Sequence, residues 1–536
     1  MLPEPRGRRH GLAGALGLLA GFAVAVFGAF WILDYFFLSS PPGTGGPAGQ
    51  LFDFDPDTLQ NALGNLAQII AAVLGIAITV VSIVVQLAAT RYTSRVADMF
   101  FRDRTNLAIM GFFVVACIDA VWVSLSVTKD YVPRATIIVT VMIVTGSLLL
   151  LIPYFAYVFA FLDPEKVIAR IGDQTLENAV YDGDDGDDVP TRQAMTVASM
   201  EQLADIAVNA LSQKDKVIAS DAIDALKRVV VAYLPRKAAL PPAWFHLGQR
   251  LRENPDFVAM ARESVDSIEA RKVWFEWKAL RQFRTVYAES LKAMPEMAHV
   301  VAIETRYVGE AAISVRDHEV LALVVKFTNT YLRAALNARD VRTAYNVLNQ
   351  YRQLAEHTLR SGLTDTTLEV GGYFKYYGQL GHAMGLGFVT ETAAYDLCSL
   401  CEIAFDAGAE CHNQLLRTFL DVDKEAESAA EEKALRGVRK AQAKLATYYL
   451  LKGAEAKARE IYQDMAMESP ERLRSIREEM LSITSREFWE VIDRGTNFDY
   501  LDDARKDQLR RFFRWFPRLA QDEEPAGTRL TAPVKG

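Results

Sequence analysis

The stretch from Asn61 to Thr90 places its polar and apolar residues on separate faces of a predicted helix. At about 100° per residue, a set of polar and small residues falls within about 40° of one line. This set, which we call the polar stripe, is Asn61, Gly64, Gln68, Gly75, Thr79, Ser82 and Gln86. The opposite face is apolar and includes Ile70, Ala77 and Val81. Because lipid alone does not explain such a split, we predict that the polar stripe faces either protein or water.

Three further apolar stretches are long enough to cross a bilayer as helices, at residues 11–37, 107–127 and about 137–161. The first follows three arginines and lacks a small-residue cleavage pattern, so we predict a retained span rather than a cleaved signal peptide. The sequence therefore predicts a membrane domain of four transmembrane helices within residues 1–162.

The positive charges of the short loops predict the orientation of these spans. Four arginines lie between the second and third spans, and we call them the arginine loop: Arg91, Arg95, Arg102 and Arg104. The Gly- and Pro-rich loop after the first span, residues 39–50, carries no Lys or Arg. We therefore predict that both termini and the arginine loop are cytoplasmic.

Asp119 is an acid about twelve residues into the third span, near the middle of the bilayer. A carboxylate at that depth costs roughly 2.5–3.5 kcal/mol on insertion scales, so it needs a partner or an aqueous path. Thr79, Thr145 and Ser147 are its expected neighbours by depth. Two interpretations remain open, a protonated carboxyl hydrogen-bonded between helices and a binding site for a proton or cation.

The polar stripe leaves a similar choice. Small residues let helices approach closely, and Gln, Ser and Thr side chains form hydrogen bonds between helices, which favours a packing seam. The alternative is a water-filled path between assembled subunits. The candidate residues for this seam or path are Gln68, Thr79, Ser82, Gln86 and Asp119.

Composition agrees with a chain that is part membrane and part water-soluble. Of the 536 residues, 51% are hydrophobic and 24% are charged. The net charge of −8 argues against a nucleic-acid partner, since such proteins are basic. Of the four cysteines, one lies in a predicted membrane helix and three lie far downstream, so no disulfide framework is implied.

Beyond the last span the pattern is helical. Residues 163–195 are predicted to be a linker that contains the acidic loop DGDDGDD at 182–188. The loop does not fit an EF-hand, because Gly186 and Gln193 stand at two ligand positions. Residues 196–520 are predicted to form an α-helical cytoplasmic domain, and residues 521–536 a disordered tail.

One helical hairpin in this domain, within residues 439–472, resembles a tetratricopeptide repeat. The landmark positions are Leu445, Ala446, Tyr449, Gly453, Ala458, Tyr462 and Pro470. The resemblance favours stacked helical pairs, and such stacks commonly offer a concave face to a protein partner.

The segment from Ser82 to Asn106 resembles a bacterial family of predicted membrane proteins, domain of unknown function 2254. Its matching positions are Ser82, Gln86, Tyr92, Arg95, Arg102, Asp103 and Arg104, whereas Ser94 stands where the family usually has proline. Glu201 to Leu226 is similar to the family's post-membrane segment, although Lys214 and its neighbours replace the family's usual stretch there. The resemblance covers residues 11 to about 235 and implies a multi-pass protein of the bacterial inner membrane, without an activity.

Candidate chemistry in the sequence is sparse. The seven histidines form no H-E-x-x-H pattern, and no G-x-S-x-G occurs. Cys398 and Cys401 form a C-x-x-C pattern inside an apolar helical run, which favours buried thiols over zinc. We therefore expect no enzymatic activity, no cofactor and no metal.

These observations favour a membrane-anchored helical scaffold or regulatory protein, assembled as a homo-oligomer in the lipid bilayer and binding a protein partner through its cytoplasmic domain. The alternative is an oligomeric ion channel or transporter whose polar path follows the second membrane helix and whose cytoplasmic domain gates it.

Overall fold

A computed structural model describes residues 21–22, 24–25, 27–38, 56–91, 100–101, 103–128, 131–181, 189–423, 435–488, 494–495 and 497–520. In these residues the secondary structure is helical apart from one isolated bridge between Thr128 and Tyr131. The chain divides into two compact units, Met1–Arg170 and Ile171–Gly536. We call them the membrane unit and the soluble unit, and each is described by itself.

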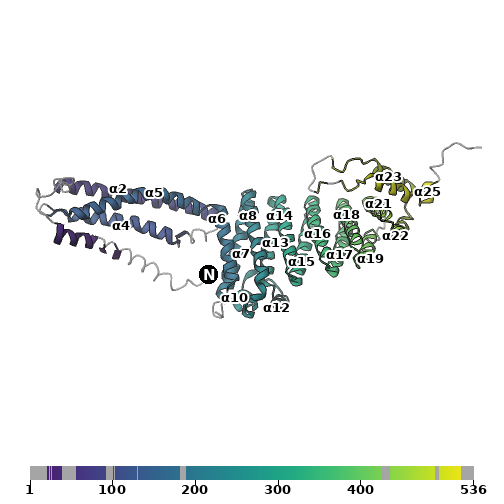
Figure 1. Cartoon of the computed structure of the whole chain (residues 1–536), viewed down its shortest axis with the longest axis horizontal. Coiled ribbons are helices and arrows are strands. Elements are labelled where there is room, and N and C mark those ends of the chain that lie inside the picture. Colours follow the sequence, from purple (N-terminus) through teal and green to yellow (C-terminus); the bar gives the residue numbers. More distant parts are fainter. Residues whose placement is uncertain are drawn as a thin grey trace, which may run out of the picture. The chain divides into compact units, whose positions relative to one another are not determined.

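Three helices of the membrane unit are long and apolar enough to cross a bilayer. They are α2 (Pro56–Arg91), α4 (Arg104–Ser126) and α5 (Arg134–Phe161), and each packs against the other two (Figure 1). They coincide with the second, third and fourth predicted spans, so the structure has three of the predicted spans as candidate membrane helices.

The first predicted span falls partly outside the described residues, which begin at residue 21. Its described part includes a shorter apolar helix, Phe27–Phe36, that runs into the π-helical turn η1 (Asp34–Leu38). A total of four spans therefore stays a prediction.

Asp34 joins this first helix to the start of α5. Its buried carboxylate accepts hydrogen bonds from the backbone amides of Ala135 and Thr136, at 3.0 and 2.8 Å. The Thr136 hydroxyl donates a third hydrogen bond at 2.7 Å. The first amides of a helix have no partners within that helix, so a carboxylate at this position stabilises them. Asp34 thus caps α5 from a different helix.

We expect that replacing Asp34 by alanine destabilises the first turn of α5 by about 1 kcal/mol, as the loss of a helix cap usually does. Hydrogen–deuterium exchange of the Ala135 and Thr136 amides should then become about fivefold faster, since 1.4 kcal/mol corresponds to a factor of ten. Asp57→Ala, at an exposed acid in the first turn of α2, is the control and should leave this exchange unchanged. Equal exchange in Asp34→Ala and wild type would contradict the capping role.

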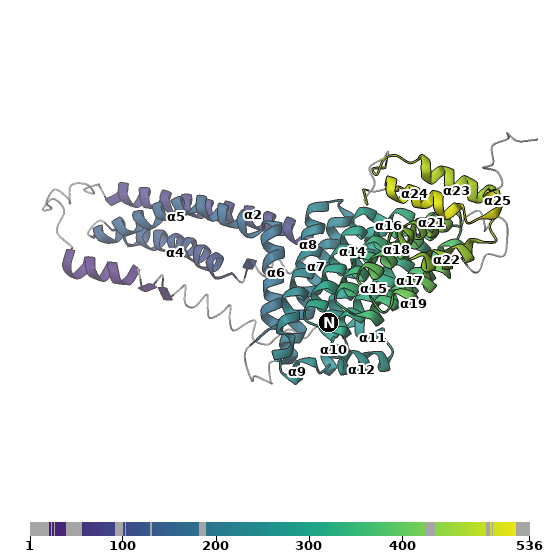
Figure 2. The ribbon, with the colours of Figure 1, turned by 45° about the vertical axis from the view of Figure 1, so that its right-hand side comes forward.

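The soluble unit begins within α6 (Pro164–Ala179), which crosses the boundary between the two units, and continues through a long series of helices (Figure 2). The first group is α7 (Val189–Ser212), α8 (Lys216–Tyr233), η4 (Leu234–Ala239), α9 (Pro242–Phe245), α10 (Gln249–Arg252), α11 (Pro255–Val258) and α12 (Arg262–Ala270). The second is α13 (Trp274–Ala293), α14 (Pro295–Ser314), α15 (His318–Asn337), α16 (Val341–Arg360), α17 (Thr364–Ala383) and α18 (Gly387–Asp406). The third is α19 (His412–Leu420), α21 (Arg436–Leu451), α22 (Glu455–Met465), α23 (Pro470–Ser482), α24 (Asp503–Phe513) and α25 (Pro517–Ala520).

The long helices of the soluble unit form two layers. One layer runs through α8, α14, α16, α18 and α21, and the other through α7, α13, α15, α17 and α19. Each of these helices packs against its neighbour in the chain and against the next helix of its own layer. This is the arrangement of stacked helical pairs that the sequence predicts.

The central helices repeat at a constant interval. The helices from α14 to α18 each have 20 residues and begin at residues 295, 318, 341, 364 and 387, which are 23 residues apart. The residues with a left-handed backbone in the turns keep the same interval: Arg316, Arg339, Gly362, Gly385 and Gly408. The constant interval keeps the helices in register, so that successive pairs stack with the same geometry.

The turns follow a common design. At Arg339 a positive φ of 54° ends α15, and the backbone amide of Asp340 donates to the carbonyl of Ala335 across the turn. The Asp340 side chain then accepts from the amide of Thr343 and caps α16. Lys214 and Asp215 build the same turn between α7 and α8. The stretch where this chain departs from the family pattern is therefore a tight turn between helices.

The predicted linker, residues 163–195, contains all of α6 and the start of α7, and its acidic loop lies outside the described residues. The predicted disordered tail, residues 521–536, also lies outside them. The hairpin that resembles a tetratricopeptide repeat is formed by α21 and α22, which pack together across a turn at Gly453.

Candidate functional site

The polar stripe of α2 lies on the outside of the membrane unit. Gln68, Thr79, Ser82 and Gln86 are all exposed. Gly75, between them on the same line, is also exposed, and an added Cβ there would meet no atom within 4 Å. Gly64, nearer the start of the helix, is half-buried beside Ser124 of α4, and the described residues of this unit leave the rest of the polar face of α2 uncovered.

The apolar face of the same helix points inward. Ile70 and Ala77 are 0% exposed, and Val81 is 3% exposed. A third face carries Ile76 and Ile83, which are 63% and 53% exposed, as expected of side chains that meet lipid. The helix therefore has separate surfaces for its own bundle and for lipid, and the polar stripe is distinct from both.

The side chains of the stripe differ in how their hydrogen bonds are satisfied. The Thr79 hydroxyl donates to the Gly75 carbonyl of its own helix at 2.8 Å, so it can face an apolar medium at little cost. The amides of Gln68 and Gln86 have no hydrogen-bond partner among the described residues. An amide that is removed from water without a partner costs at least about 1–3 kcal/mol. The two glutamines are thus the part of the stripe that most needs a partner.

Asp119 does not lie on this surface. It is 2% exposed in α4, and its carboxylate accepts a hydrogen bond from the Thr140 hydroxyl of α5 at 2.6 Å. The neighbours expected from depth lie elsewhere: Thr79 and Thr145 are exposed, and Ser147 donates to the Ile143 carbonyl of its own helix. The structure therefore places Asp119 between α4 and α5 and apart from the exposed stripe.

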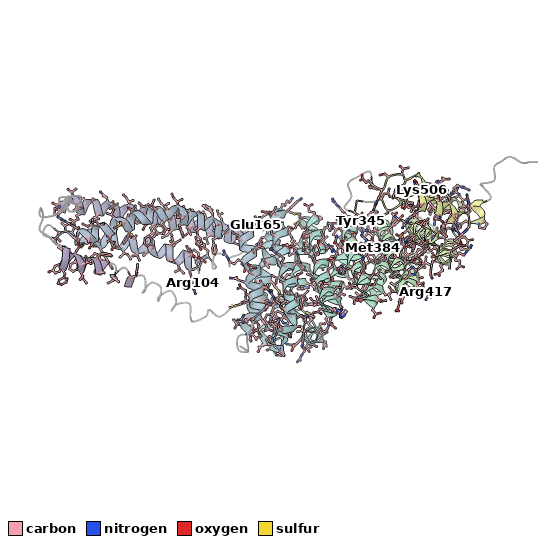
Figure 3. The ribbon with its side chains drawn as sticks, in the orientation of Figure 1. Arg104, Glu165, Tyr345, Met384, Arg417 and Lys506 are labelled. Carbon is pink, nitrogen blue, oxygen red and sulfur yellow. The ribbon has the colours of Figure 1, made fainter. Side chains whose placement is uncertain are left out.

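The arginine loop is described only in part. Arg104 is exposed at the first position of α4, where it is labelled in Figure 3. Arg91 is the last residue of α2, and its side chain lies outside the described residues, as do Arg95 and Arg102.

A residue between these arginines has a defined structural role. Asp103 caps α4 by accepting from the amides of Thr105 and Asn106, and the Tyr157 hydroxyl of α5 also donates to it. The Tyr154 hydroxyl donates to Asn106 at 2.9 Å in the same cluster. Sequence reasoning noted Asp103 as part of a motif, and its place directly before an apolar helix was the signal for a cap.

The fold and the site define an all-α membrane protein with a large helical soluble unit. Residues 12–199 match the model of the family described as "Predicted membrane protein (DUF2254)". The resemblance drawn from Ser82 to Asn106 is thereby confirmed, whereas the similarity of Glu201 to Leu226 lies beyond the matched residues.

Two further comparisons add little. No curated protein matches the chain. A solved structure titled "Circular tandem repeat protein with novel repeat topology and enhanced subunit contact surfaces" is similar at 15% identity, covering 87% of this chain and 96% of its own. Its TM-score is 0.25.

Proposed function

We propose that this protein is a homo-oligomeric membrane scaffold, in which the polar stripe of α2 in one copy packs against the same stripe in a second copy. The observation that supports the proposal is the exposure of Gln68 and Gln86 on a helix that is long and apolar enough to cross a membrane. The polar stripe is not buried in its own bundle, and its glutamine amides are not suited to lipid. Such a face needs another protein surface or water.

A second copy of the chain fits this surface chemically. A glutamine amide both donates and accepts hydrogen bonds, so two identical faces can satisfy each other across a two-fold axis. Gly75 leaves open space on the stripe and lets two helix backbones approach closely. Both features favour pairing of identical helices.

The soluble unit would then act as the platform of the assembly. Positive charges in the arginine loop support a cytoplasmic location for that loop, and the family resemblance supports a bacterial inner membrane. With both termini in the cytoplasm, the two-layered stack of helices would lie in the cytoplasm and present its faces to a protein partner. In this proposal the protein works by binding and not by catalysis.

Site-directed cross-linking tests the interface. In a Cys117→Ser background, where the remaining native cysteines are buried, Thr79→Cys places a thiol on the stripe. Ile76→Cys, on the lipid-facing side of the same helix, is the matched control. Oxidation in native membranes should cross-link Thr79→Cys into dimers and leave Ile76→Cys monomeric. Equal cross-linking of the two variants, or none in either, would contradict the proposed interface.

An ion channel is the second candidate, because the same exposed amides could line a polar path between subunits. Ion flux into liposomes that contain the purified protein separates the two functions. A scaffold predicts no flux, whereas a path along the stripe predicts a flux that Gln86→Leu changes. Asp119→Asn should not change such a flux, since Asp119 is buried against Thr140.

A further inference from the structure

A cavity of about 550 Å³ opens in the soluble unit. It is lined by residues of α16, α18, α21 and α24, together with Arg494 and Phe498, which precede α24 in the chain. Its size is within the range of sites that bind small molecules, roughly 300–1,000 Å³. Neutral polar side chains contribute to its lining, namely Asn349, Gln353 and Ser399. Polar groups that converge on a cavity of this size can orient a polar ligand.

Charged side chains dominate the rest of the lining. Four cations, Arg352, Lys444, Arg494 and Arg505, stand against two carboxylates, Asp396 and Glu402. The three arginines are paired. Asp396 binds Arg494 at 2.5 Å and Arg352 at 3.3 Å, and Glu402 binds Arg505 through two hydrogen bonds of 2.9 and 3.0 Å.

Lys444 lacks such a pair. Its ammonium donates to the Phe498 carbonyl at 2.5 Å and lies 5.7 Å from the centre of the Tyr395 ring, but no carboxylate among the described residues lies within 4.0 Å of it. Burial lowers the pKa of Lys444, and nearby Arg505 adds to this effect, although Cys398 and Glu402 oppose it. A largely buried cation without a counter-charge is unfavourable unless something else supplies that charge.

A lysine one turn earlier in α21 shows the contrast. Lys440 is paired with Asp499 at 2.7 Å, Glu479 at 3.2 Å and Glu391 at 3.5 Å. Burial acts to lower its pKa as well, but the carboxylates outweigh burial and raise it. Neighbouring elements thus supply three counter-charges to Lys440, whereas no carboxylate among the described residues pairs with Lys444, which faces the cavity.

We propose that this cavity binds a small organic anion whose carboxylate or phosphate group pairs with Lys444. The anion supplies the counter-charge that the described residues do not, and its polar remainder contacts Asn349, Gln353 and Ser399. The site is independent of the membrane stripe and of the scaffold function.

The test is a calorimetric titration of the full-length protein in detergent with two probes, inorganic phosphate and citrate. Wild type should bind at least one of them with a dissociation constant of about 1 mM or lower. Lys444→Met and Lys444→Gln should each weaken that binding at least about tenfold. Lys452→Met, at an exposed lysine just after the same helix, should bind as wild type does. Binding of one probe alone assigns the site to carboxylates or to phosphates, and binding of both assigns it to the oxyanion that they share.

Thermal unfolding without a probe shows whether the Lys444 variants are folded. Since Lys444→Met removes an unpaired buried charge, its unfolding temperature should equal or exceed that of wild type. Absence of binding by wild type for both probes up to about 10 mM would overturn the proposal, and so would equal binding by wild type and both Lys444 variants.

Discussion

Replacing Arg439 by leucine is expected to lower the free energy of unfolding of the soluble unit by about 3–5 kcal/mol, as the loss of one partner from a buried ion pair does. Arg439 in α21 is largely buried and binds three carboxylates, Asp423 at 2.6 Å, Asp464 at 3.0 Å and Glu468 at 2.6 Å. These acids come from the turn after α19, from α22 and from the turn after α22. The substitution leaves their negative charges buried together without the arginine.

The same variant should show a characteristic dependence on pH. Burial raises the pKa of Asp423 to about 6, although Arg439 opposes the rise. A carboxyl whose pKa is higher in the folded than in the unfolded state stabilises folding at low pH, and this stabilisation is lost as the pH rises through the folded pKa. Without Arg439 the pKa of Asp423 rises further, so the loss of stability should be larger at about pH 8 than at about pH 5.

Urea unfolding of the full-length protein, followed by circular dichroism, measures both effects. Arg510→Leu is the matched control, because Arg510 is exposed and pairs only with Asp507 in its own helix among the described residues. It should change the stability by less than about 1 kcal/mol. If the two variants unfolded at the same urea concentration, the three-carboxylate cluster would not stabilise the unit as described.

Lys278→Met is expected to have an effect of similar size, about 3–5 kcal/mol, at the other end of the soluble unit. The Lys278 side chain is 0% exposed in α13 and bonds to Glu201 of α7 at 2.7 Å, and to Asp256 of α11. Burial alone would raise the pKa of Asp256, but Lys278 and Arg281 hold it below its ordinary value. Removing the ammonium therefore leaves the carboxylates of Glu201 and Asp256 without this cation where α7, α11 and α13 meet.

Thermal unfolding of Lys278→Met beside Lys444→Met tests this argument directly. The first variant should unfold at a lower temperature than wild type, and the second should not, although both replace a largely buried lysine by methionine. Lys292→Met, at a lysine whose side chain is 75% exposed, controls for the loss of a surface charge. A loss of stability in Lys444→Met equal to that in Lys278→Met would show that pairing is not what separates these lysines.

Local pattern predicted the elements of the fold well. Three candidate spans and the polar and apolar faces of α2 follow from periodicity, which is a property of neighbouring residues. The stacked helical pairs follow from the resemblance of one hairpin to a tetratricopeptide repeat. The constant 23-residue interval was missed, because it is carried by helix starts and turn residues and not by a repeated motif. Arg316 and Arg339 occupy the same backbone conformation as Gly362, so the interval is hidden at the level of residue type.

The parts that required packing could not be read from the sequence. Depth along a helix placed Asp119 level with Thr79, but the rotation of α4 turns it toward Thr140 of α5. Whether the stripe of α2 faces inward or outward depends on which face the other helices cover. The cavity beside Lys444 joins residues as far apart as Asn349 and Arg505. A lone lysine in a helical pattern carries no sign that its counter-charge is missing.

The interval of the central helices also governs how this protein could change its length. Since α14, α16 and α18 occupy one layer and α15 and α17 the other, residues two intervals apart hold equivalent places. Duplication or deletion of a two-helix segment would keep every later helix in its own layer. Duplication or deletion of a single helix would move every later helix into the other layer. Natural variants with soluble units of different length should therefore differ by whole helical pairs. The same holds for engineered spacers built from this unit.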